Sequence, residues 1–266
     1  MSRKKRRERK LLQEMGVTSH PNRHEDKTSK GNRDIMEERQ ASREDYKLDW
    51  FKPTERQKDI IYSILTNQLT AVQGSSGCGK STTAIWQGLK FLKEGRYKRI
   101  LFIKTPSEDG SDQIGFLQGS AESKLEKHMK AMRSIFHTFM SPKKLEMEEK
   151  HKRITFDIPN FVAGETFYDT FVIIDEHQKI SPDTTKLLLE RVHESSAVVM
   201  LGDKAQRYAA KKRLDGFTDF VDMITEVDEE GRYSVEDLMG YVELPASENM
   251  RGELSRRIVT LYEAKD

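Results

Sequence analysis

One eight-residue stretch constrains this chain more than any other, the loop Gly74-Ser75-Ser76-Gly77-Cys78-Gly79-Lys80-Ser81. It fits the phosphate-binding pattern G-x-x-x-x-G-K-[ST] at every fixed position. Residues 69–73 before it predict a short buried strand, and residues 80–93 after it predict a helix. A strand, a glycine-rich loop and a helix N-terminus in this order direct backbone N–H groups at a phosphate. A flexible Gly/Ser linker is the competing interpretation, and the flanking strand and helix argue against it.

The side chains of this loop have roles set by their chemistry. Lys80 is expected to reach the β- and γ-phosphates, and the Ser81 hydroxyl is expected to ligate Mg²⁺. Cys78 is the single cysteine of the chain, and we interpret it as a position whose backbone N–H binds phosphate, not as a catalytic thiol. The predicted phosphate-binding set is Gly74, Ser75, Ser76, Gly77, Cys78, Gly79, Lys80, Ser81 and Thr82.

A second motif follows the run 171–174, which is apolar and β-branched like a parallel strand buried on both faces. It ends in Asp175 and Glu176, where a strand's carboxyl end meets the ligand crevice of an open α/β sheet. Asp175 is predicted to hold Mg²⁺, and Glu176 to orient and deprotonate the attacking water. The alternative is an acidic turn before a helix that begins near Ser181. The phosphate loop upstream favours the hydrolytic site.

A third apolar run, residues 197–201, leads into Gly202-Asp203-Lys204-Ala205-Gln206. This order places a carboxylate and an amide at the carboxyl end of another strand. Gln206 is predicted to hydrogen-bond the γ-phosphate or the lytic water. Taken alone, the pentad would fit an ordinary turn at the end of a strand better.

In their order and spacing, these three motifs resemble those of the PhoH-family ATPases, relatives of the motor core of superfamily 1 helicases. The resemblance covers about residues 50–264 and includes the Gly-Phe-Leu-x-Gly element at 115–119. It implies a RecA-like P-loop NTPase fold, an α/β domain with a mainly parallel sheet flanked by helices. Arginines of the family pattern are missing at two places, because Lys104 replaces a common arginine and residues 163–165 replace an Arg-Gly-Arg. Such losses remove forked donors that could contact nucleic acid or a neighbouring subunit.

The resemblance also implies roles for single residues outside the three motifs. Gln57 would read the adenine edge and favour ATP, although a solvent-facing glutamine in a helix at 55–66 is an equal alternative. Arg251, in the C-terminal motif, is implied to stabilise charge on the transferred phosphate. His177 stands where the family has a small residue, so it is either a simple variant or a group that tunes activity with pH.

A ring of subunits, with a hexamer expected, is implied as well. A helicase motor of this superfamily binds nucleotide between two such domains, and this chain has sequence for one. A second copy in head-to-tail contact would supply the other. Arg251 would then act on the γ-phosphate of the neighbouring subunit. RNA or single-stranded nucleic acid is the partner that the helicase relationship implies.

Composition places the chain in a broad class. Charged residues make up 34% of its 266 residues, with a formal net charge of +2. No apolar run approaches the roughly eighteen residues needed to span a bilayer. The N-terminus is basic but lacks the apolar segment of a secretory signal. With a single cysteine, these features predict a cytoplasmic protein without a membrane partner.

The composition changes near residue 46. Residues 1–46 open with a basic cluster at 3–7 and lack hydrophobic periodicity, which predicts a disordered charged arm. This arm either binds nucleic acid or an acidic partner, or is a solvated tail without a target. Residues 47–266 are predicted to form the ATPase domain, whose charged insert at 207–240 could hold a short hairpin. The basic cluster near Tyr208 in this insert would suit a single-stranded nucleic acid backbone, although a solvated surface is the commoner explanation of such a run. The predicted strands are 69–73, 99–104, 154–158, 171–175, 197–201 and 241–245, and the predicted helices are 55–66, 80–93, 122–139, 182–193 and 252–263.

Three classes of function fit a phosphate loop: an ATPase that acts on nucleic acid, a phosphotransferase, and a nucleotide-switched binding module with little turnover. The Asp-Glu pair argues against a phosphotransferase, because a substrate hydroxyl does not need a glutamate poised on water. The Gly-Asp-x-x-Gln motif argues against a pure binder. The sequence therefore predicts Mg²⁺-dependent ATP hydrolysis by in-line water attack, in an enzyme that is also a candidate helicase. Its predicted catalytic residues are Lys80, Glu176, Gln206 and Arg251, and its predicted metal ligands are Ser81 and Asp175.

Overall fold

The computed structural model describes residues 36, 40–41, 43–105, 121–162, 164–204, 215–227 and 233–263. Contacts between residues divide the chain into two units, Met1–Glu44 and Asp45–Asp266. The predicted arm, residues 1–46, lies almost entirely outside the described residues. The second unit contains the whole sheet and the site described below.

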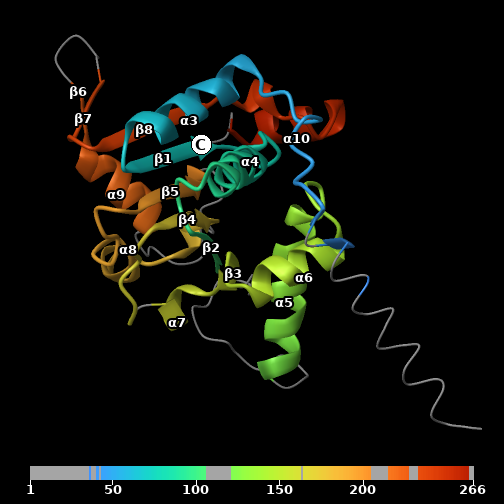
Figure 1. The fold of residues 1–266 in the computed structure, drawn as a ribbon. Helices are drawn as coiled ribbons and strands as arrows, with labels where there is room; N and C mark the ends of the chain where they lie inside the picture. The colour runs from blue at the N-terminus through green and yellow to red at the C-terminus, as the bar shows by residue number, and fades with distance from the viewer. Residues whose placement is uncertain are drawn as a thin grey trace, which may run out of the picture. The chain divides into compact units, whose positions relative to one another are not determined.

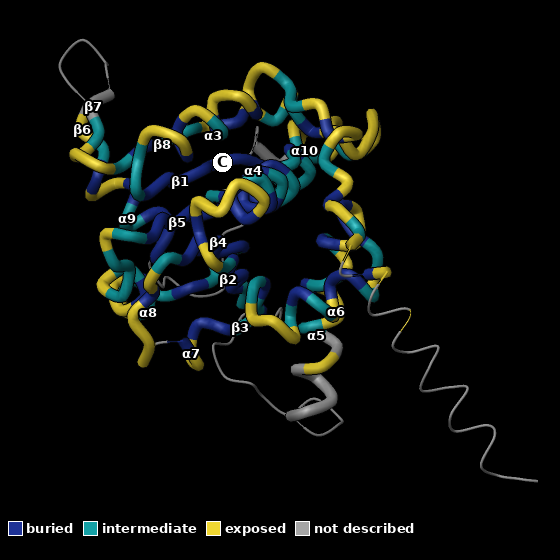
Figure 2. The backbone as a smooth tube through the Cα atoms, viewed as in Figure 1, coloured by how far each residue is buried: buried dark blue, intermediate teal, exposed yellow. Residues whose placement is uncertain are grey.

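A six-stranded sheet organises the second unit, in the order β3-β2-β4-β5-β1-β8 (Figure 1). Each neighbouring pair of strands is parallel. The strands are β1 (Leu69–Gly74), β2 (Arg99–Lys104), β3 (Ile154–Asp157), β4 (Thr170–Asp175), β5 (Ala197–Gly202) and β8 (Met239–Leu244). The inner strands β1, β4 and β5 are buried along their whole length (Figure 2), as their apolar runs predict. The mainly parallel α/β fold is confirmed.

Helices cover both faces of the sheet, because successive strand residues point to opposite sides. Ile100 and Phe102 of β2 belong to one hydrophobic core, and Leu101 and Ile103 belong to the other. The first core is closed by α3 (Glu55–Thr66), α4 (Lys80–Glu94), α5 (Ala121–Phe136) and α6 (Pro142–Lys150). The second is closed by α7 (Pro159–Val162), α8 (Pro182–Leu189) and α9 (Gly216–Ile224). The sheet is therefore the middle layer of three.

The structure corrects part of the predicted helix pattern. The helix predicted at 122–139 ends at Phe136, and α6 begins separately, where the Ser141 side chain accepts a hydrogen bond from the Lys144 N–H. The helix predicted at 182–193 ends at Leu189. Helix α9 was not predicted, although Asp215 caps it by accepting from the Thr218 N–H at 2.6 Å.

The charged insert contains the predicted hairpin. Strands β6 (Thr225–Val227) and β7 (Tyr233–Val235) pair antiparallel. The basic cluster at 211–213 and Tyr208 lie outside the described residues, as does the Gly-Phe-Leu-x-Gly element. The remaining elements are the 3₁₀ helices η1 (His177–Lys179) and η3 (Ala246–Glu248) and helix α10 (Glu253–Glu263). No helix in the described part of the chain is both long and apolar enough to cross a membrane.

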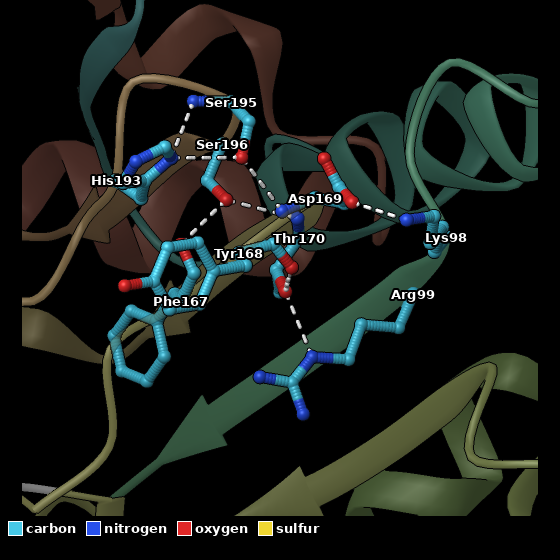
Figure 3. Close-up of polar contacts among 9 residues, drawn as sticks. All are labelled: Lys98, Arg99, Phe167, Tyr168, Asp169, Thr170, His193, Ser195 and Ser196. Atoms are coloured by element: carbon cyan, nitrogen blue, oxygen red, sulfur yellow. Dashed lines mark hydrogen bonds and ion pairs between the residues drawn. The ribbon is translucent and has the colours of Figure 1, made fainter.

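Hydrogen bonds to the backbone fasten the amino ends of β4 and β5 (Figure 3). Ser196 Oγ accepts from the Thr170 N–H at 2.9 Å and donates to the Phe167 carbonyl at 2.7 Å. Ser195 Oγ accepts from the Asp169 N–H at 3.0 Å. These short side chains continue the pairing of the two strands beyond the sheet itself, so this edge is closed by the protein's own polar groups.

Candidate nucleotide-binding site

The glycine-rich loop joins β1 to the N-terminus of α4, as predicted. Gly77 and Gly79 have φ angles of +89° and +78°. A Cβ atom on Gly79 would lie 2.5 Å from Gln57 Nε2, and one on Gly77 would lie 3.0 Å from Asn249 Oδ1. Glycine is therefore required at both positions by the backbone conformation and by close neighbours.

Three consecutive carbonyls of the loop are held by donors from outside it. The pairs are Asn249 Nδ2 with Ser76 O at 2.9 Å, the Met250 N–H with Gly77 O at 3.0 Å, and Gln57 Nε2 with Cys78 O at 3.1 Å. Because each peptide unit is planar, a carbonyl held on one side directs the following N–H to the other side. The contacts of Asn249 and Met250 with the loop were not predicted. They preorganise the loop as a cradle for an anion.

Lys80 and Ser81 follow this cradle at the start of α4. Lys80 Nζ donates to the carbonyls of Gly74 at 2.5 Å and Ser75 at 3.0 Å. Burial lowers the pKa of Lys80, against the opposing charge of Asp203. Ser81 Oγ donates to Asp175 Oδ1 at 2.9 Å, which joins the loop to the end of β4. The two predicted metal ligands are thus in direct contact.

Asp175 and Glu176 lie at the carboxyl end of β4, beside two lysines. Lys104 is paired with Asp175 in the register of β2 and β4. Its Nζ lies 2.7 Å from Asp175 Oδ2 and 3.5 Å from Glu176 Oε1. Lys179 Nζ, from η1, lies 2.6 Å from Glu176 Oε2. Each carboxylate therefore has an ammonium partner.

Electrostatics keep these groups charged. Burial acts to raise the pKa of Glu176, but the contact with Lys179 and the charge of Lys104 outweigh it, and this pKa is lowered. Burial acts to lower the pKa of Lys104, but the charges and contacts of Asp175 and Glu176 raise it. Glu176 also has φ 56° and ψ 41°, a left-handed conformation that costs a glutamate about 1–2 kcal/mol.

His177, the next residue, is fully buried. Its Nε2 lies 2.8 Å from Thr185 Oγ1. Burial lowers the pKa of His177 to about 3, so the ring stays neutral in the neutral range. The pH-tuning interpretation is therefore wrong, because the side chain points into the protein and not into the site.

Most of the predicted site residues line one cavity of about 640 Å³. Its lining includes residues 76–82, Asp175, Glu176, Gln57 and Arg251, together with residues 50–52, which were not predicted. Gln206 lies outside the described residues.

Gln57 is only 1% exposed, so a solvent-facing role is wrong. Its amide oxygen accepts from the Thr54 N–H at 3.1 Å, and its Nε2 lies on the loop carbonyl of Cys78 and near Met250 Sδ. Its contact with the loop links the start of α3 to the cradle. Its predicted reading of adenine stays a prediction.

The donors present fit Mg²⁺ bound together with a triphosphate. Ser81 offers a hydroxyl and Asp175 a carboxylate, which are the hard oxygen ligands that Mg²⁺ prefers. The described residues contain no group of three or more His, Cys, Asp or Glu that could hold a metal. Mg²⁺ is usually held by one or two carboxylates and by the phosphates of its nucleotide, so this pair of ligands is sufficient.

A parallel α/β sheet whose first strand enters a glycine-rich phosphate loop, with an acidic strand end opposite, defines the P-loop NTPases. The family model described as "PhoH-like protein" matches residues 52–263. The chain therefore belongs to the PhoH family, as the motifs predicted.

Individual relatives are distant. The chain is similar to a "PhoH-like protein" of Bacillus subtilis (strain 168), with 23% identity over 210 residues that cover 79% of this chain and 63% of that protein. It is also similar to "Protein PhoH2" of the same organism, with 29% identity over 163 residues, 58% of this chain and 37% of that one. The chain thus spans less than two thirds of these relatives. Among solved structures, the large terminase ATPase domain of Thermus phage P74-26 matches with a TM-score of 0.45 and 16% identity, over 80% of this chain and 88% of that one.

Proposed function

We propose that the chain hydrolyses ATP with the help of Mg²⁺. One observation carries the proposal. Ser81 Oγ on the phosphate loop lies 2.9 Å from Asp175 Oδ1 on β4, and Glu176 lines the same cavity. A nucleotide-binding protein without turnover needs the loop, but it does not need a second carboxylate next to the metal ligand.

Each residue has a defined task in this reaction. Lys80 leaves the loop carbonyls and neutralises charge on the β- and γ-phosphates. Ser81 and Asp175 would hold Mg²⁺, which would supply charge stabilisation for the phosphates when bound. Glu176 accepts a proton from the attacking water. Gln206 aligns that water.

Arg251 completes the charge stabilisation. A Cβ atom built on Gly77 would lie 3.1 Å from the Cγ and Cδ atoms of Arg251, so its side chain runs along the phosphate loop of its own chain. This position supports action on the nucleotide bound by the same subunit. Action on a neighbouring subunit's nucleotide remains the alternative within a ring.

The same proposal extends to the partners of the ATPase. We propose that hydrolysis is coupled to binding or unwinding of RNA or single-stranded nucleic acid by a ring-shaped oligomer, with a hexamer expected. The support comes from the family and from the basic clusters of the sequence at 3–7 and 211–213. A ring also provides the second domain that a helicase-like motor needs.

Phosphate release measured with poly(U), single-stranded DNA and duplex DNA tests the coupling. Stimulation by a single strand supports a nucleic-acid-dependent ATPase. Unstimulated release supports hydrolysis without this partner, and no release under any condition contradicts the proposed function.

Mixing two inactive variants locates the arginine. If Arg251 acts on a neighbour, Arg251→Ala mixed with Glu176→Gln gives some interfaces with both groups intact, and activity partly returns. If it acts within its own subunit, no activity returns. Light scattering that finds a fully active monomer contradicts the ring.

A further inference from the structure

Lys104 forms an ion pair with Asp175, the carboxylate proposed to bind the metal. Asp175 is 5% exposed, and both of its oxygens are in use. Oδ1 accepts from Ser81 Oγ at 2.9 Å, and Oδ2 accepts from Lys104 Nζ at 2.7 Å. A divalent cation that joins Ser81 and Asp175 would lie within contact distance of this ammonium. Metal and ammonium therefore compete for one carboxylate.

The position of Lys104 is fixed from two directions. Its backbone belongs to β2, in register with Asp175 of β4. Its carbonyl accepts a hydrogen bond from His128 Nε2 of α5 at 2.9 Å. The side chain is 19% exposed, so its range of movement is restricted and directed into the cavity. The contact with Asp175 follows from the sheet and is not a chance encounter of two surface side chains.

The formal charges of this cluster cancel without a nucleotide. Asp175 and Glu176 carry two negative charges, and Lys104 and Lys179 carry two positive charges at the contacts given above. A free divalent cation would enter a site that is already neutralised, and it would face an ammonium at short range. A metal–triphosphate complex brings its own negative charge, to which the displaced ammonium can turn.

We propose that Lys104 is a placeholder cation, which occupies the metal-binding carboxylate of Asp175 in the nucleotide-free protein and yields it only to a metal ion that arrives with a triphosphate. The inference rests on the proposed function for the identity of the ligand. In this scheme Lys104 is a positioning residue: it prevents occupation by metal alone, and after displacement it stays next to Glu176 and the terminal phosphate.

Binding of Mn²⁺ alone, measured by electron paramagnetic resonance of the free ion, tests the proposal without any turnover. The wild-type protein should bind Mn²⁺ weakly. Lys104→Met should bind it at least about tenfold more tightly, because a positive charge a few ångströms from the ion is removed. Lys104→Arg keeps the charge and should stay within roughly threefold of the wild-type affinity.

Two further variants locate the effect. Lys98→Met removes the lysine that pairs with Asp169 at the amino end of β4, so it should leave the Mn²⁺ affinity unchanged. Asp175→Asn added to Lys104→Met should abolish the gain. If Lys104→Met does not fold, Lys104→Gln serves in its place, since its amide can still donate to Asp175 while the charge is gone.

The inference is overturned if the folded neutral variant, Lys104→Met or its substitute Lys104→Gln, binds Mn²⁺ within roughly twofold of the wild-type affinity. It is equally overturned if Lys104→Arg binds as tightly as Lys104→Met, because charge would then not be the cause. Since these titrations contain no nucleotide, their result is separate from whether the wild-type protein releases phosphate from ATP.

Discussion

Strand β4 is flanked by two acidic residues in left-handed conformation, Asp169 before it and Glu176 after it, with φ angles of 49° and 56°. Each pairs with a lysine, Lys98 Nζ at 2.5 Å and Lys179 Nζ at 2.6 Å. At the amino end, the lysine is 82% exposed, and the Ser195 and Ser196 hydroxyls hold the nearby strand ends by neutral hydrogen bonds to the backbone (Figure 3). At the carboxyl end, both partners are mostly buried and line the cavity or lie next to it.

This difference indicates that the amino end of β4 stabilises the fold, whereas the charged groups at its carboxyl end can change their interaction partners. Among residues other than glycine, aspartate adopts the left-handed conformation more often than glutamate, because its short polar side chain can hydrogen-bond locally. Hydrogen bonds to the backbone, like those of Ser196, have no competitor inside the protein. In the proposed reaction, the ion pairs around Asp175 and Glu176 occupy groups that a nucleotide and its metal would also need. Strain and close charges at one end of a strand therefore indicate function, while similar geometry at the other end serves structure.

The largest effect is expected from Glu176→Gln. The amide cannot accept the proton of the attacking water, so turnover should fall at least about a hundredfold while ATP binding is retained. Steady-state phosphate release and equilibrium binding of a fluorescent ATP analogue measure the two quantities. Asp169→Asn is the matched control at the other end of β4, and it should change neither. Wild-type turnover by Glu176→Gln would rule out its role as the base.

The second largest effect is expected from Lys80→Ala. This variant should bind ATP roughly tenfold to a hundredfold more weakly, because charge-assisted contacts to the phosphates are lost. Binding of the same fluorescent analogue measures this. Lys98→Ala removes an exposed lysine from the amino end and should leave the affinity unchanged. Equal affinities for Lys80→Ala and the wild type would contradict the phosphate cradle.

Ser196→Ala, at the amino end of β5, should lower stability without lowering turnover, the opposite of what is expected for Glu176→Gln. Its hydroxyl accepts from the Thr170 N–H and donates to the Phe167 carbonyl, and the residue is 2% exposed. Its removal leaves buried backbone groups without partners and should lower the free energy of unfolding by about 1–3 kcal/mol. Urea denaturation measures this loss. Turnover per folded molecule should stay at the wild-type level, and a large fall would show that the amino end also takes part in catalysis.

The sequence predicted the strands well because each depends on its own apolar run. The six strands of the main sheet begin and end within two residues of their predicted limits, and β8 differs most, starting at Met239 where residue 241 was predicted. Helices were less predictable where a cap sets their limits. Ser141 and Asp215 begin α6 and α9, but a single capping residue is a weak pattern beside a long amphipathic run.

The site divides in the same way. The phosphate loop and the acidic pair are local motifs, and the structure brings them together as predicted. The contacts of Lys104 with Asp175 and Glu176 and the donors behind the loop are long-range, whereas Lys179 lies only three positions after Glu176. Asn249 and Ser76 are separated by 173 positions, and no periodicity or spacing in the sequence connects them. Lys104 was noted only as a replacement for an arginine, because its contact with Asp175 depends on the register of two strands.

The smallest effect is expected at Asn249. This residue tests whether the carboxyl end of the sheet, where the phosphate loop lies, also contains a hydrogen-bonded residue that only stabilises the fold. Its Nδ2 donates to Ser76 O at 2.9 Å and its Oδ1 accepts from the Arg251 N–H at 2.9 Å, and the residue is 2% exposed. Asn249→Ala should weaken nucleotide binding about twofold to tenfold, because one carbonyl of the cradle loses its partner. Ser255→Ala removes only the contact between Ser255 Oγ and Asn249 Nδ2, and it should keep the wild-type affinity.

Two measurements separate positioning from stability in this pair. If Asn249 positions the loop, its loss lowers nucleotide affinity at a temperature where the variant is fully folded, as circular dichroism can verify. At one fixed, excess ATP concentration, the increase in the free energy of unfolding that ATP produces should be smaller for this variant. This increase grows with the logarithm of the ATP concentration divided by Kd, so it falls when the affinity falls. If the variant unfolds more easily but binds ATP as the wild type does, Asn249 stabilises the fold, as Ser196 does, and does not position the loop. The two ends of the sheet would then differ only in their charged residues.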